Sequence, residues 1–148
     1  MSVKFRLLPE HKAILIQYFG SVRQSEVLAL SAHHVANTEL PISYTKVIDL
    51  SGMVETDLDF SRIHAVMGGY QRASATHKIK MTCLVFAPSD LAFATSRIFQ
   101  NFAALSDDVE VSVFRSFENL TPCLGLDDTS YEDLFGGDIL QDWQELSA

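Results

Sequence analysis

The chain has 148 residues, of which 47% are hydrophobic and 20% are charged, as expected for one soluble globular domain. Its net charge of −8 is concentrated in residues 127–148, which hold seven of the 19 acidic residues and no Lys or Arg, so residues 1–126 sum to −1. This balance excludes nucleic acid as an expected partner, because phosphate binding requires a cluster of basic residues.

The first residues, Met1–Lys4, lead directly into a strand-like pattern without an apolar leader segment. No apolar run approaches the ~20 residues that a membrane-spanning helix needs. We therefore expect a cytoplasmic protein in which Cys83 and Cys123 stay reduced.

Two short strands are predicted at the start of the chain, over Val3–Leu8 and Lys12–Phe19. The first alternates apolar and basic residues and should be half exposed, whereas Ala13–Ile16 in the second is continuously apolar and should be buried. After Gly20, the spacing of Ser21 and Gln24 predicts a capping box and a helix. The expected apolar face of that helix consists of Val27, Leu28, Ala32 and Val35.

The stretch Thr45–Phe60 predicts a strand that delivers a loop to the start of a helix. A buried strand over Lys46–Leu50 should end at Ser51-Gly52, and the helix should open near Asp57 or Asp59. Ligands and partners of open α/β sheets dock at such places. The apolar stripe of the helix consists of Phe60, Ile63, Val66, Met67 and Tyr70.

Two further strand and helix pairs follow. Lys80–Phe86 reads as a strand covered on both faces, and Pro88-Ser89-Asp90 then starts a helix. The expected stripe of this helix consists of Leu91, Ala94, Ile98, Phe102 and Leu105, with Phe99 beside it. Val109–Val113 alternates as a last strand, and a short helix capped by Ser116 should restart at Thr121 with Pro122 in its first turn. The order ββαβαβαβα predicts an α/β fold with a mostly parallel sheet.

The chain should divide near Gly125–Asp128 into a domain over residues 1–126 and an acidic extension over residues 127–148. Apolar residues from Ile139 to Leu146, with Trp143 among them, recur at helical spacing and predict an amphipathic helix. We expect this helix to pack on its own domain or on the partner in a homodimer.

Three segments together resemble a known family: KVIDLSG at 46–52, VFAPSDLAFATSRIFQNF at 85–102 and VEVSVFRSFENLTPCLGL at 109–126. The first is similar to the DLSG strand of STAS domains, the family of the anti-sigma factor antagonists. The other two resemble the SpoIIAA-like (STAS/SEC14-like) bacterial branch. The resemblance covers most of residues 1–126. It implies a mixed sheet of about five strands with helices packed on it, and a docking module without catalysis.

One function that the resemblance implies is regulation through a protein partner. The docking loops would contain Ser51, Gly52, Asp57, Asp59, Ser61, Ser89 and Asp90. Many STAS domains are switched by phosphorylation of a serine at the start of the second helix, where this chain has Asp57-Leu58-Asp59-Phe60 instead. Asp59 could supply a permanent negative charge, but the favoured role is that of a helix N-cap.

The other implied function, and the one that we favour from sequence alone, is binding of an apolar small molecule or lipid, with reversible membrane contact. The ligand would lie between the second and third helices, against Phe60, Ile63, Met67, Leu91, Phe93, Phe99 and Phe102. Aromatic residues at helical spacing are more often plain core, and Phe93 lies off the stripe, where it could form a surface patch.

No residue pattern predicts catalysis, a metal or a cofactor. His33 and His34 are adjacent on a helix and point ~100° apart, so they do not chelate one metal together. A hydrolase that uses Ser61 and His64 lacks a nucleophile elbow and an oxyanion loop. We therefore expect a binding protein that is not an enzyme, with His64 on the surface.

Overall fold

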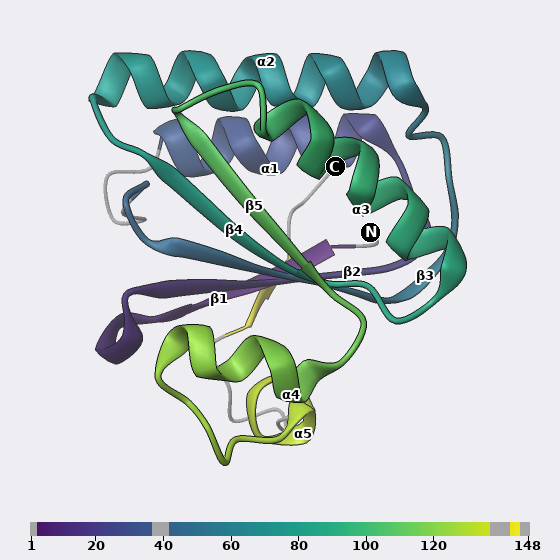
Figure 1. Cartoon of the computed structure of the whole chain (residues 1–148), viewed down its shortest axis with the longest axis vertical. Coiled ribbons are helices and arrows are strands. Elements are labelled where there is room, and N and C mark those ends of the chain that lie inside the picture. Colours follow the sequence, from purple (N-terminus) through teal and green to yellow (C-terminus); the bar gives the residue numbers. More distant parts are fainter. Residues whose placement is uncertain (1–2, 37–41, 137–142, 146–148) are drawn as a thin grey trace.

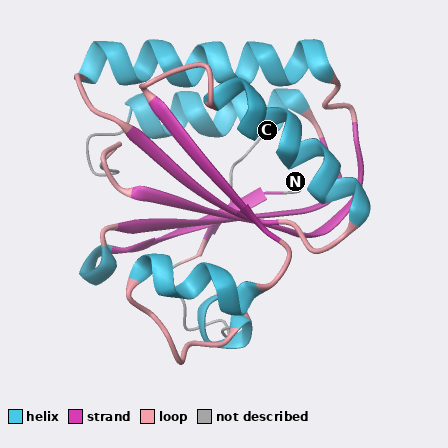
Figure 2. Cartoon of the chain, viewed as in Figure 1, coloured by secondary structure: helices cyan, strands magenta, loops and turns pink. Residues whose placement is uncertain are grey.

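The computed structural model describes residues 3–36, 42–136 and 143–145, and they form one twisted sheet with helices on both faces (Figures 1 and 2). In chain order the elements are β1 (Val3–Leu8), η1 (Pro9–His11), β2 (Ala13–Val22), α1 (Gln24–Ala36), β3 (Thr45–Thr56), α2 (Phe60–His77), β4 (Met81–Phe86), α3 (Asp90–Ala103), β5 (Val109–Phe114), α4 (Phe117–Leu120), η2 (Thr121–Leu124), α5 (Tyr131–Leu134) and β6 (Gln144–Glu145).

The sheet has the strand order β5-β4-β3-β2-β1-β6. The pairs β2–β3, β3–β4 and β4–β5 are parallel because a helix crosses over between the strands of each pair. β1 and β2 are antiparallel and are joined by the short η1 turn. The predicted order ββαβαβαβα and the mostly parallel α/β sheet are confirmed, and β6 adds a short sixth strand at the β1 edge.

Two layers of helices cover the sheet, and each buries its own core (Figure 1). We call the face under α1, α2 and α3 the helical face, and the face under α4, η2 and α5 the C-terminal face. Alternation along the strands divides the side chains: Ile48 and Val85 belong to the helical core, and Val47 and Leu84 to the other. Each such buried side chain contributes roughly 1.5–3 kcal/mol to folding.

The third strand is longer than predicted. β3 does not stop at Ser51-Gly52 but runs on to Thr56, paired with the last residues of β2 beyond the end of β4. Gly52 allows β3 to approach β2 closely, because a Cβ at this position would lie 3.1 Å from the Cβ of Phe19. Gly20 lies at a register shift with a φ of +71°, a backbone conformation that favours glycine.

The first helix differs from its prediction at its start and in its buried face. The capping box is wrong: the Gln24 N–H donates to Asp57 Oδ1, and the Ser21 hydroxyl is buried without a hydrogen-bond partner in the described chain. Leu30 and His34 are buried, whereas Leu28 and Val35 are exposed. Apolar residues lie all around this helix, so packing against the sheet rather than periodicity chose the face.

The stripe predicted for α3 is correct only in part, since Phe99 and Phe102 pack against the helical core. The buried residues of α3 are Ala92, Thr95, Ser96 and Ala103, and Leu91 and Leu105 of the predicted stripe are exposed. Small side chains on the inner face let the helix lie close to the sheet, so size decided the orientation more than hydrophobicity did. The prediction for the next segment is confirmed, since a second short helix begins at Thr121 with Pro122 in its first turn.

The described residues 143–145 contact β1 and Phe135. The amphipathic helix predicted from Ile139 to Leu146 falls largely outside the described residues, and Gln144–Glu145 form a strand antiparallel to β1 instead. The exposed edge of β1 offers unpaired backbone groups that such a strand can satisfy. The Trp143 ring lies 5.9 Å from that of Phe135, and the Lys4 ammonium lies over it at 5.0 Å.

Candidate functional site

The start of α2 lies at the edge of the sheet where the parallel strands end (Figure 1). Asp59 is the N-cap of α2: its Oδ1 accepts the Arg62 N–H at 2.8 Å, and the Arg62 guanidinium lies 3.2 Å from its Oδ2. Asp57 Oδ1 accepts the Gln24 N–H at 2.8 Å and so links the starts of α1 and α2. Both carboxylates are thus committed to local structure, as the capping role predicted for Asp59 requires.

The other predicted docking residues lie in separate places. Ser61 is exposed in the first turn of α2, next to the two aspartates. Ser51 and Gly52 are exposed but belong to strand β3 rather than to a loop, which corrects that part of the prediction. Ser89 and Asp90 form a second corner, where Ser89 Oγ accepts the Ala92 N–H and Arg115 lies 2.7 Å from Asp90.

An aromatic surface patch lies beside the capped start of α2. Phe60, the first residue of this helix, is 68% exposed, and its ring centroid lies 4.8 Å from that of Phe102 on α3. The His64 ring, one turn further along α2, lies 5.0 Å from the same Phe102 ring. We call Phe60, His64 and Phe102 the α2–α3 patch. Its two phenylalanines, which were predicted ligand contacts, therefore meet each other at the surface.

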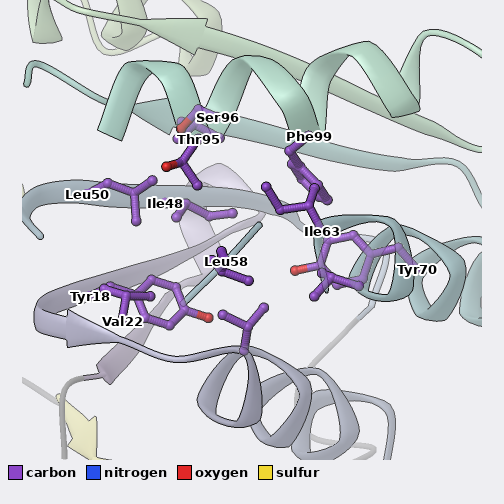
Figure 3. Close-up of a pocket in the computed structure, with 13 residues that line it drawn as sticks. Tyr18, Val22, Ile48, Leu50, Leu58, Ile63, Tyr70, Thr95, Ser96 and Phe99 are labelled. Carbon is purple, nitrogen blue, oxygen red and sulfur yellow. The ribbon is translucent and has the colours of Figure 1, made fainter. Parts of the chain in front are cut away.

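A small cavity of about 70 Å³ lies on the helical face beneath α1, α2 and α3 (Figure 3). Of the predicted ligand contacts only Ile63 and Phe99 line it. Figure 3 shows the hydroxyls of Tyr18 and Tyr70 pointing toward its middle. Burial raises the pKa of both tyrosines, so both hydroxyls stay protonated at neutral pH.

The remaining predicted ligand contacts lie elsewhere. Met67 is fully buried in the helical core, and Leu91 is 41% exposed. Phe93 is half-buried against that core, with the guanidinium of Arg115 over its ring at 4.9 Å and that of Arg97 at 5.9 Å. The structure thus brings together two pairs of the seven predicted residues rather than all of them.

A hydrogen-bonded group on the C-terminal face was not predicted. Asp49 is completely buried, and its carboxylate accepts hydrogen bonds from the Tyr131 hydroxyl at 2.5 Å, the Gln17 amide at 2.9 Å and the Ser51 N–H at 2.9 Å. Desolvation and then the bond to Asp49 raise the pKa of Tyr131 to about 12. Tyr131 is 82 residues away from Asp49 in the sequence, so no local pattern predicts this hydrogen bond. The sequence signal that this segment packs inward is its pair of aromatic residues, Tyr131 and Phe135, whose rings stack on each other.

Two further properties concern metals and membranes. Within residues 3–36, 42–136 and 143–145, no three His, Cys, Asp or Glu side chains are grouped so that they could hold a metal ion. Among the helices of that same part, none combines the length and the apolar character that a membrane span requires. His64 is exposed, as predicted.

Comparisons with known proteins identify the fold. No protein-family model matches the sequence, and no curated protein matches it. Among solved structures, the chain is similar to the anti-sigma factor antagonist SpoIIAA in its unphosphorylated form, with a TM-score of 0.51 and 11% sequence identity over 84% of this chain and 98% of that one. The chain therefore has the SpoIIAA-like, or STAS, fold that the sequence resemblance predicted.

Proposed function

We propose that this chain is a non-catalytic docking module whose protein partner binds the α2–α3 patch and the capped start of α2. The observation that carries the proposal is Phe60, a large aromatic side chain that is 68% exposed where a rigid helix begins. Exposed aromatic residues are typical of the energetic centres of protein interfaces. Asp59 and Arg62 flank Phe60 and supply a polar rim that water can reach.

The fold supports a regulatory role of this kind. SpoIIAA is named as an antagonist of an anti-sigma factor, so the action of that protein is directed at another protein. The similarity to SpoIIAA concerns the fold alone, because the two sequences are only 11% identical. The chemistry of the patch is therefore the reason to place the partner at this edge of the molecule.

The proposal is tested by capture of a partner and then by binding of the purified pair. The full chain is immobilised in three forms, wild type, Phe60→Ser and the control Val35→Ser, and exposed to a lysate of the source cells. Val35 is also an exposed apolar residue, but it lies near the end of α1. We expect wild type and Val35→Ser to retain one protein that Phe60→Ser loses. A purified partner that binds Phe60→Ser as tightly as wild type would overturn the proposal.

A second candidate function, binding of an apolar molecule, is favoured by the cavity on the helical face. Ile63, Val66 and Phe99 give it an apolar wall, and Tyr18 and Tyr70 supply hydroxyls. Its volume of about 70 Å³ is far below the roughly 300–1,000 Å³ of pockets that hold drug-sized ligands. The proposed ligand is accordingly a small apolar molecule, and a whole lipid would enter only if α2 and α3 moved apart.

Benzene is a suitable probe for this second candidate. Saturating wild-type protein with benzene should shift the NMR methyl signals of Ile63 and Val66, which line the cavity. Ser96→Leu should fill the same space and abolish these shifts, whereas Leu105→Ser, a change at an 85% exposed residue, should leave them intact. Absence of shifts in the wild type would rule out the ligand site.

A further inference from the structure

A larger groove of about 450 Å³ lies at the opposite end of α2 from the α2–α3 patch. The last turns of α1 and α2 form its two sides, and Lys46 and Met81, at the starts of β3 and β4, form its floor. The groove falls within the size range of small-molecule sites. It is separate from the proposed docking surface.

Lys46 is the first unusual group in this groove. Its side chain points to the helical face and is only 3% exposed. Its ammonium lies over the Tyr70 ring, 5.8 Å from the ring centroid. Removing an ammonium from water is costly unless an acceptor compensates its charge. Burial accordingly lowers the pKa of Lys46.

His34 is the second unusual group in this groove. It is 2% exposed, and neither of its ring nitrogens has a hydrogen-bond partner in the described part of the chain. One side of the ring is occupied by Phe5, edge-on at 5.0 Å. Burial and the nearby Lys46 charge lower the pKa of His34 to about 3, so at neutral pH the imidazole is uncharged and offers one N–H donor.

The remaining lining residues indicate the chemistry of a ligand. Arg72 and His77 add basic groups from α2, and none of the described residues that line the groove is acidic. The rest of the lining is mostly apolar, with Leu28, Val35 and Met81 as its larger side chains. Basic and N–H groups on the floor of an apolar groove suit a molecule with an anionic head and an apolar body.

We propose that this groove binds a small organic carboxylate, with the carboxylate on Lys46 and His34 and the apolar body between α1 and α2. A carboxylate accepts several hydrogen bonds, so it can satisfy the ammonium and the imidazole N–H at once. An uncharged ligand would leave the Lys46 charge uncompensated. An organic cation would place a second positive charge beside it. The proposal is independent of the protein-docking function.

The test uses calorimetric titration of the full chain with two carboxylates, octanoate and benzoate, and with their neutral counterparts octan-1-ol and benzyl alcohol. Wild type should bind at least one carboxylate more tightly than its alcohol. Lys46→Met, which removes the charge and is only one atom shorter, should weaken binding of that carboxylate by roughly tenfold or more and leave binding of the alcohol unchanged, because charge-assisted hydrogen bonds are lost. Comparison of octanoate with benzoate shows whether the groove prefers a ligand whose apolar part is a chain or a ring.

The matched control is Lys80→Met, a change at an exposed lysine that precedes β4 and pairs with Glu110 outside the groove. It should bind both carboxylates as the wild type does. Lys46→Met should fold, since it replaces a buried charge by an apolar group of similar size. The proposal fails if neither carboxylate binds wild type, if the alcohols bind equally well, or if Lys46→Met binds the carboxylates undiminished.

Discussion

The two faces of the sheet differ in how the chain satisfies their most deeply buried polar groups. On the helical face, His34 and Ser96 are almost completely buried and have no hydrogen-bond partner among the described residues, whereas Ser74 and Thr95 there are hydrogen-bonded. On the C-terminal face, Asp49 is equally buried and is hydrogen-bonded by Gln17, Ser51 and Tyr131. The helical face carries the cavity and the groove, whereas short segments and a cluster of aromatic rings seal the other.

This difference determines whether a buried polar group stabilises the fold or remains available to bind a ligand. A buried polar group whose partners are supplied by the chain holds the structure together, and its loss leaves the other groups unsatisfied. A buried polar group without partners lowers stability and is free to meet a ligand. The buried groups of the C-terminal face therefore stabilise the fold, and ligand binding is expected on the helical face.

The largest expected effect is in the aromatic cluster of the C-terminal face. Phe135 is 3% exposed and lies against Tyr131 at 5.2 Å, so Phe135→Ala should lower the free energy of unfolding by about 3–5 kcal/mol in urea titrations. Phe60→Ala, at a 68% exposed ring, is the control and should change it by less than about 0.5 kcal/mol. Equal changes in the two variants would show that Phe135 does not stabilise the packing of the C-terminal face.

The second-largest effect on stability is expected from the hydroxyl of Tyr131. Tyr131→Phe keeps the ring but removes the hydrogen bond to buried Asp49, and should cost about 1–3 kcal/mol of unfolding free energy. Tyr44→Phe is a suitable control, because that residue is half-buried outside this network. If both variants melted at the same temperature, the Asp49 network would not hold the C-terminal face closed.

The helical face should weaken in mild acid because of His34. Its pKa is about 3 in the folded protein, lowered from 6.5 by burial, Lys46 and His33, so below pH 6.5 the unfolded chain binds a proton that the folded chain does not. Stability is therefore fully present above pH 6.5 and falls as the pH drops, by about 1 kcal/mol between pH 6.5 and 5.5. In His34→Leu the same titration should lack this component. Parallel pH curves for the two proteins would contradict the assignment.

The smallest effect concerns the unpartnered hydroxyl of Ser96 beside the cavity. Ser96→Ala should raise the free energy of unfolding by about 0.5–1 kcal/mol, because it removes a buried unsatisfied group and improves helix propensity. Thr95→Val is the neighbouring comparison. Its hydroxyl donates to the Leu91 carbonyl at 2.8 Å, so its removal should give no gain. Loss of stability in Ser96→Ala would show that the hydroxyl is satisfied in solution.

Many elements of the fold could be predicted from the sequence, since local patterns specify them. The strand over Val109–Phe114, the Asp59 cap and the restart at Thr121 follow from alternation, a capping residue and a proline within a few residues of each other. The inner faces of α1 and α3 could not be chosen in this way. Apolar residues surround α1, and the buried face of α3 consists largely of small residues, so packing against the sheet decided which side is buried.

The candidate sites were predicted less well for the same reason. Phe60 and Asp59 are adjacent in sequence and could be assigned to one helix start. His34 and Lys46 belong to different elements, and neither shows in its own segment that it will be buried. The Asp49–Tyr131 bond joins residues 82 positions apart, a distance that no local pattern reports.

The amino-acid sequence by itself determined the order of strands and helices, the parallel crossovers and the resemblance to STAS domains, because these depend on periodicity and caps within single segments. The tertiary structure alone decided which side chains meet across the sheet, how long the β2–β3 pair is, and where a groove retains uncompensated groups. Those outcomes depend on contacts between distant segments, whose energies arise only when the segments pack together.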